Sequence, residues 1–167
     1  GDDQTVDSSS GATFSGITLK APSGAGVISP TSTLMKEGGL TATEVAEVLG
    51  LPDDVDPLTF NPFADGVDAA KALEVAKVSK QITAALSSFA SAAEGAGAGA
   101  DDAFKTALNS MVEVVKTKAA KAKDTNASAA DKKIDFTKTD DLELIKAKVA
   151  TKAATLDGID MTTMNAL

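Results

Sequence analysis

The spacing of apolar residues along the chain changes near Thr41. From there onward, apolar side chains recur at intervals of three and four residues, which is the period of an amphipathic α-helix. The last residues, 157–167, have the composition of the start of a further helix. The pattern predicts helices over residues 41–49, 67–94, 101–123 and 140–156.

The long predicted helices carry narrow, alanine-rich apolar faces. Alanine has the highest helix propensity but buries little area, so helices of this kind are marginal alone and need one another. The sequence therefore predicts an all-α fold class, with a small three- to four-helix bundle over 41–167. The predicted stripes are Val75, Val78, Ile82, Ala85, Phe89 and Ala92, with Leu73 and Leu86 beside them; Phe104, Leu108, Met111, Val115 and Ala119; and Leu142, Ile145, Val149 and Ala153.

Residues 1–40 are instead rich in Gly, Ser, Thr and Asp. Within them, Phe14–Leu19 alternates like a short strand, and the segment APSGAGVISP contains too much Gly and Pro for regular structure. We therefore expect an irregular or short-β N-terminal arm, or the end of a preceding β-domain, packed on a helical domain over 41–167. The apolar residues expected to anchor this arm are Val27, Ile28, Leu34 and Met35.

Short local signals mark the predicted helix ends. Thr41-Ala-Thr-Glu44 is a capping box, in which the Thr hydroxyl and the Glu carboxylate each accept a hydrogen bond from a free backbone N–H group. Asp140 and Glu143 resemble a second capping pair. The sequence GAGAG, Gly95–Gly99, ends the longest helix, and we expect it to be a flexible hinge.

Composition narrows the chemistry that the chain can perform. The 167 residues include 24 acidic side chains and 16 basic ones, all of them Lys, and no His, Cys, Trp or Tyr. A Ser–His triad, a thiol nucleophile and the usual zinc, haem or iron–sulfur ligand sets are therefore excluded. A net charge of −8 without Arg disfavours nucleic-acid binding, and no apolar run approaches the length of a transmembrane helix. We predict that the chain is not an enzyme.

The densest group of oxygen ligands lies between the first and second predicted helices. Calcium takes six to eight oxygen ligands, so this loop is a candidate calcium site and the one cofactor that the sequence suggests. The alternative, which the sequence favours, is that these residues cap helices, because the loop lacks the regular spacing of an EF-hand and acidic groups stabilise helix N-termini. The residues are Asp53, Asp54, Asp56, Asn61, Asp65 and Asp68.

Lysines are concentrated at one place, between Lys116 and Lys123, near the end of the predicted helix 101–123. Such a run could contact an anionic polysaccharide, a lipid headgroup or an acidic partner. Cations at a helix C-terminus also complement the helix dipole, and this second interpretation is favoured.

One segment carries a more specific pattern, LKAPSGAGVISPTSTLMKEGGLTATEVAEVLGLPDDVDPLTFNPF. It resembles a segment of very large secreted bacterial proteins, namely adhesins of the RTX, type I secreted class and surface-layer-like proteins. There the series typically follows a small β-domain and leads into alanine-rich helices. The matching residues are Ala21, Pro22, Gly24, Val27, Ser29, Pro30, Thr33, Leu34, 49–52, Val55, Asp56, Phe60, Asn61 and Pro62.

The resemblance implies an extracellular or cell-surface location and a non-catalytic structural or adhesive module that spaces or presents neighbouring domains. Its partners would be those domains of the same polypeptide, and a surface glycan or protein. The alternative is a ligand-binding module that recognises a glycan, a lipid or a protein through a groove between helices, opened at the Gly95–Gly99 hinge.

Overall fold

The computed structural model describes residues 18–165. Within this range the regular secondary structure consists of α-helices, joined by turns and loops, and there is no strand. The all-α prediction is therefore confirmed for the part of the chain that is described. The strand expected over Phe14–Leu19 lies mostly outside that part, and Thr18 and Leu19 have no regular structure. The helices are α1 (Pro30–Gly38), α2 (Ala42–Leu49), α3 (Ala69–Gly95), α4 (Ala100–Ala122), α5 (Ala129–Lys132), α6 (Thr139–Ala153) and α7 (Met161–Asn165).

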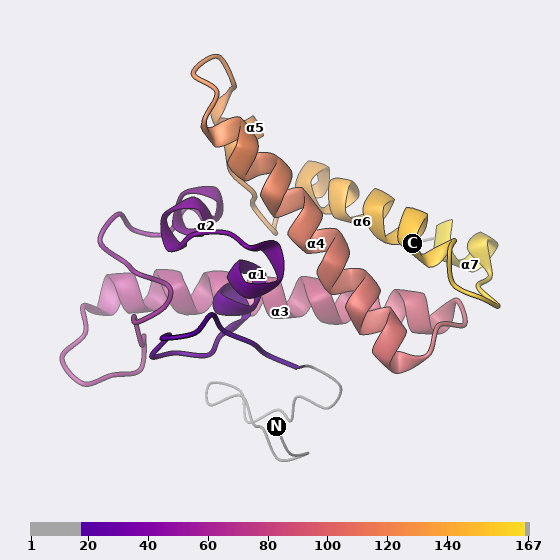
Figure 1. Ribbon diagram of the computed structural model, residues 1–167, viewed down its shortest axis with the longest axis horizontal. Helices are drawn as coiled ribbons and strands as arrows, with labels where there is room; N and C mark the ends of the chain where they lie inside the picture. The colour runs from indigo at the N-terminus through magenta and orange to yellow at the C-terminus, as the bar shows by residue number, and fades with distance from the viewer. Residues whose placement is uncertain (1–17, 166–167) are drawn as a thin grey trace.

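Helix α4 is the centre of the fold. It crosses α3, runs beside α6 and also contacts α1, α2 and α5 (Figure 1). The predicted stripe from Phe104 to Ala119 is buried as expected. The expectation of a narrow stripe is wrong for this helix, because small side chains outside the stripe let further helices approach closely. These buried small residues are Ala103, Thr106, Ala107 and Ser110.

Helix α3 places most of its predicted stripe against α4, with Ile82, Ala85 and Leu86 buried. Leu73 is the exception, since 70% of it is exposed. It stands two positions before the buried Val75, and at about 100° per residue this places it about 200° around the helix, on the far side from the core. The prediction for Leu73 is therefore wrong.

Helix α1 was not expected, and the prediction of an irregular arm is wrong for residues 30–38. Its N-terminus is closed by Ser29 and Ser32, whose side chains each accept a hydrogen bond from the other's backbone N–H group. Pro30 suits the first helical turn, where its missing N–H group is not needed. Leu34 and Met35 are fully buried in the same core as the later helices.

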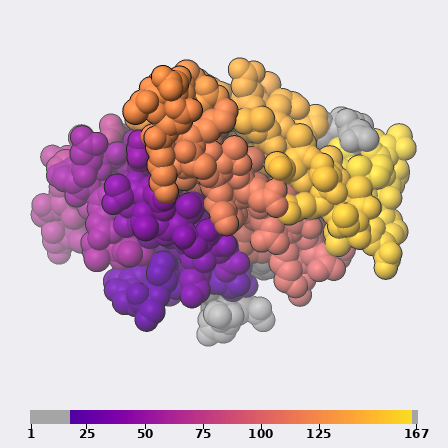
Figure 2. All heavy atoms as spheres, turned by 45° about the horizontal axis from the view of Figure 1, so that its top comes forward, coloured from indigo at the N-terminus to yellow at the C-terminus, as the bar shows by residue number. Residues whose placement is uncertain are grey.

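The extended residues before α1 are held to the fold by backbone contacts. Lys20 is attached at both polar groups of its backbone: its N–H group donates to the Thr33 hydroxyl at 2.9 Å, and its carbonyl accepts from the hydroxyls of Ser32 and Thr33. The backbone N–H groups of Gly26 and Val27 both donate to the carbonyl of the loop residue Leu58. This segment therefore joins α1 to the loop before α3, and Figure 2 shows these N-terminal parts packed closely on the remaining helices.

The predicted helix ends are partly correct. The capping box of Thr41 and Glu44 opens α2 as expected. The pair Asp140 and Glu143 does not cap α6, which begins one residue earlier, after Lys138, without a side-chain cap. Asp140 instead lies in the first turn, where its negative charge interacts favourably with the helix dipole.

The turn from α3 to α4 is packed against the turn before α7, in contrast to the free hinge that was expected. The backbone N–H group of Asp160 donates to the carbonyl of Ala96 at 2.8 Å. Gly97 has φ of 109°, and a Cβ atom there would lie 2.9 Å from the carbonyl oxygen of Gly158. This position therefore requires glycine, both for its backbone conformation and for the close approach of the second turn.

Candidate functional site

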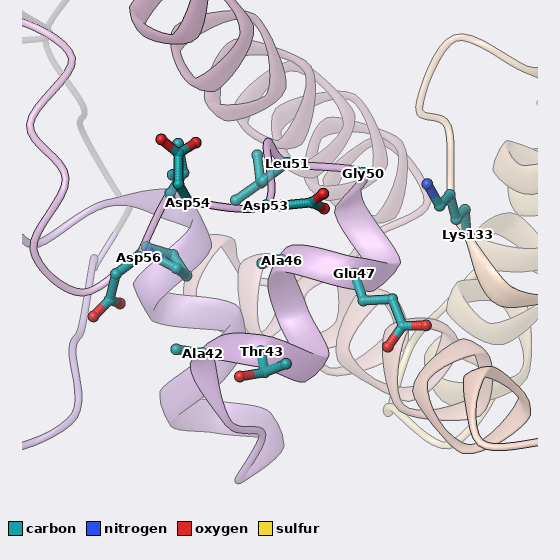
Figure 3. A pocket seen from close by; sticks show the side chains of 12 residues that line it. Ala42, Thr43, Ala46, Glu47, Gly50, Leu51, Asp53, Asp54, Asp56 and Lys133 are labelled. Atoms are coloured by element: carbon teal, nitrogen blue, oxygen red, sulfur yellow. The ribbon is translucent and has the colours of Figure 1, made fainter. Parts of the chain in front are cut away.

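A hollow of about 600 Å³ lies beside α2. Its walls come from the exposed face of α2, the loop that follows it, and Lys133, which follows α5 (Figure 3). The lining is polar and apolar in similar measure, with several acidic groups and one lysine. The residues are Ala42, Thr43, Ala46, Glu47, Gly50, Leu51, Asp53, Asp54, Val55, Asp56, Pro57 and Lys133.

Two backbone features shape this hollow. Helix α2 ends at Gly50, which has φ of 65° and turns the chain sharply into the acidic loop. The N–H group of Ile134 donates to the carbonyl of Val48 at 2.9 Å, which holds Lys133 beside the end of α2. Figure 3 shows Lys133 on the far side of Gly50 from the acidic loop. The arrangement offers carboxylates and one amine to a polar ligand.

The loop places only some of the predicted calcium ligands around this hollow. Asp53, Asp54 and Asp56 line it, whereas Asp65 and Asp68 do not. Figure 3 shows the carboxylates of Asp54 and Asp56 directed away from each other. Within residues 18–165 there is no group of three or more acidic side chains arranged to hold an ion.

Most of the predicted calcium ligands have partners within the chain. Asp54 pairs with Lys71, and this hydrogen bond lowers the pKa of the Asp54 carboxyl. Asp56 accepts a hydrogen bond from the N–H group of Leu58 at 2.8 Å, and Asn61 stabilises the next turn in the same way. Asp68 caps α3 by accepting from the N–H group of Lys71, which confirms the capping interpretation for Asp68. Calcium binding itself stays a prediction.

One lysine of the run, Lys118, is buried and makes an ion pair inside the molecule, which the interpretation as a helix-dipole effect missed. Lys118 is 7% exposed, and its amine lies 2.8 Å from the Asp141 carboxylate and 2.7 Å from the carbonyl of Ala130. The second oxygen of Asp141 accepts from the N–H group of Asp135 at 2.9 Å. The sequence held a signal for this burial, because Lys118 lies two helical turns after Met111 on the apolar stripe.

Other lysines make ion pairs between helices. Lys121 pairs with Asp131 of α5 at 3.3 Å, and Lys123 pairs with Glu44 of α2 at 2.7 Å. The Lys123 amine, together with the N–H group and hydroxyl of Thr41, lowers the pKa of Glu44 to about 2. Between α4 and α6, Lys152 and Lys148 both pair with Glu113 and lower its pKa. Three of the four lysines in the run 116–123 therefore connect α4 to other parts of the chain.

The comparisons with known proteins give no match: no protein-family model, no curated protein and no solved structure is similar to this chain. The resemblance to secreted bacterial adhesins accordingly stays a prediction from the sequence. Among residues 18–165, no helix is both long and apolar enough to cross a membrane.

Proposed function

We propose that the chain is a non-catalytic structural or adhesive module of a large extracellular bacterial protein, which spaces or presents neighbouring domains at the cell surface. The observation that carries this proposal is one continuous apolar core that runs from Leu34 in α1 to Met164 in α7. A module that transmits position between its neighbours needs its first and last elements to belong to one packed body. A shared core supplies that connection.

Ion pairs between helices support the same function. Pairs join α2, α5 and α6 to the central helix α4 or to its C-terminal cap, so these three neighbours have a polar link as well as apolar contact. The absence of His and Cys from the sequence, and the resemblance of residues 19–63 to large secreted proteins, agree with a role outside catalysis.

The test exchanges the module inside the protein that carries it. Residues 18–165 are replaced either by an unrelated helical domain with the same distance between its ends or by a flexible Gly/Ser linker. Antibodies against the chain report its presence on intact cells, and adhesion of those cells is measured. If the chain is a spacer, the antibodies should label intact cells that carry the unaltered protein. Cells with the rigid replacement should then adhere as those cells do, and cells with the flexible linker should not. Failure of the rigid replacement, or a chain confined to the cell interior, would contradict the proposal.

A second candidate function is ligand binding, and the hollow beside α2 favours it. In this alternative the ligand is a polar molecule such as a glycan, held by Glu47, Asp53 and Lys133. Glycan-array binding that Glu47→Gln and Lys133→Gln both abolish would favour this candidate over the spacer. Glu74→Gln, an exposed change on α3 away from the hollow, serves as the control.

Calcium in the acidic loop is tested by calorimetry. If the loop holds the ion, a titration to millimolar Ca²⁺ gives heat and raises the melting temperature, because a ligand that binds only the folded state stabilises it. Asp53→Asn should then remove both effects. No heat and an unchanged melting temperature would exclude the site.

A further inference from the structure

The connection between α4 and α5 carries the sequence Asn126-Ala127-Ser128. An Asn followed by any residue except Pro and then by Ser or Thr is the acceptor sequence for N-linked glycosylation. It occurs once in the 167 residues, because none of the other asparagines has Ser or Thr two positions later. A short motif of this kind needs support from its structural surroundings, namely an exposed loop that a transferase can reach.

The surroundings of Asn126 meet this requirement. Residues 123–126 are all exposed, and Figure 1 shows this connection projecting from the end of α4, at the top of the view. The Asp124 carboxylate accepts a hydrogen bond from the N–H group of Asn126 at 2.8 Å, and the Asp124 carbonyl accepts one from Ala127 at 3.3 Å. These bonds form a turn with Asn126 at its tip. Within the described part of the chain, no hydrogen bond is made by the Asn126 side-chain amide, so a transferase would not have to break one to bind it.

Breaking the hydrogen bonds of the Ser128 hydroxyl would cost the fold little stability. This hydroxyl accepts from the N–H group of Asp131 at 3.2 Å and donates to the Asp131 carboxylate at 2.7 Å, which caps α5. Helix α5 has four residues and none of them is buried. Opening its first turn would therefore break this cap and loosen the contact of Ala130 with Lys118, while Lys118 keeps its partner Asp141. A transferase can thus engage the acceptor sequence in the folded protein.

We propose that Asn126 is an N-glycosylation site, an inference that rests on the extracellular location given under the proposed function. The donor is a sugar activated as a diphosphate ester, either lipid-linked or nucleotide-linked. The side-chain amide nitrogen attacks the anomeric carbon, a carbon–nitrogen bond forms, and the carbon–oxygen bond to the diphosphate breaks. The diphosphate leaves with the electron pair, and one amide proton passes to a base. The glycan then stands at the tip of the module, away from the core.

The experiment uses the full-length protein recovered from the organism that makes it. Cleavage after lysine yields the peptide Asp124–Lys132, and fragmentation mass spectrometry locates any added mass on it. We expect the mass of a sugar on Asn126. In cells, Asn126→Gln and Ser128→Ala should abolish that mass, and Ser128→Thr should keep it because threonine also completes the acceptor sequence. Asn126→Gln should leave the melting temperature unchanged.

The outcomes separate this inference from the proposed function. An unmodified Asn126 in protein that antibodies detect on intact cells would overturn the glycosylation site and leave the surface module standing. An unmodified Asn126 in protein confined to the cell interior would overturn both. A sugar attached to another residue of the peptide, or one that persists in Asn126→Gln, would also overturn the assignment.

Discussion

Replacing Lys118 by Met tests the buried ion pair that connects α4 to the start of α6. Met has a similar length and no charge, so it fills much of the same space while removing the partner of Asp141. The carboxylate of Asp141, which is 8% exposed, would then keep one hydrogen bond, from the N–H group of Asp135, and lose its countercharge. The Ala130 carbonyl would also lose its donor.

The expected loss of stability follows from that uncompensated charge. Removing one partner of a buried pair destabilises a protein by about 3–5 kcal/mol, because the remaining ion stays desolvated. Since both side chains here retain slight exposure, we expect the lower end, about 3 kcal/mol. For a chain of this size, 1 kcal/mol corresponds to roughly 2–4 °C in melting temperature, so the melting temperature should fall by about 6–12 °C. The double variant K118M/D141L should recover much of the loss, because it buries no unpaired charge.

Urea titration followed by circular dichroism measures the free energy of unfolding of each variant. Lys116→Met is the matched control, since it removes an exposed lysine from the same helix and should change stability by less than about 0.5 kcal/mol. If Lys118→Met is as stable as this control, the pair does not hold the helices together. If the double variant is less stable than Lys118→Met alone, the reasoning about the unpaired carboxylate is refuted.

Three further predictions concern the packed turn, the unexpected first helix and acid stability. Gly97→Ala should destabilise the fold by about 1–3 kcal/mol in urea titrations, because Gly97 has a positive φ and lies against the carbonyl of Gly158 in the turn before α7. Its control, Gly95→Ala, should be neutral or stabilising, because there is open space around Gly95. Leu34→Ala should remove about 2–5 kcal/mol by the same measurement, while Ile28→Ala, 64% exposed, should have little effect; equal effects would contradict the place of α1 in the core. The pKa of Glu44 is lowered from 4.5 to about 2 in the folded state, so its stabilising contribution is complete above pH 4.5 and is lost as the pH falls toward 2. The melting temperature should therefore drop over this range of pH. In the Glu44→Gln variant, the melting temperature should depend less steeply on pH.

The sequence allowed the long helices to be predicted because their signals are local. The period of apolar residues and the capping box at Thr41 place α2, α3, α4 and α6 within a few residues of their observed bounds. Helix α1 was missed because its composition is that of a loop, and only the serines around Pro30 indicated a helix start. Its stability comes from tertiary contacts, in particular the burial of Leu34 and Met35. Nothing local in the sequence specifies those contacts.

The candidate sites were harder to predict for a different physical reason. Which of several carboxylates faces a hollow, caps a helix or pairs with a lysine depends on elements that meet only in the folded chain. The capping interpretation is correct for Asp68, whose partner, the N–H group of Lys71, lies in the first turn of the same helix. The pairing of Asp54 with the Lys71 side chain could not be predicted, because Lys71 belongs to a helix that starts after a long loop. The lysine run was interpreted as a helix-dipole effect, and the pairing of Lys118 with Asp141 was missed, because the two residues are separated in sequence by the end of α4, by α5 and by the loop before α6.

The alanine-rich helices and the ion pairs have complementary roles in this fold. Contacts between alanines differ little when one helix slides along another by a turn, so such an interface favours close approach without selecting a register. A lysine and a carboxylate that must meet in a buried place are sensitive to the same displacement, because a shift of one turn, about 5.4 Å, would separate the two charges. Between α4 and α6, Lys118 with Asp141 is such a buried pair, and Glu113 with Lys152 is a second, partly exposed pair farther along the interface. The buried pair therefore favours the observed alignment of two helices whose apolar contacts supply most of the attraction.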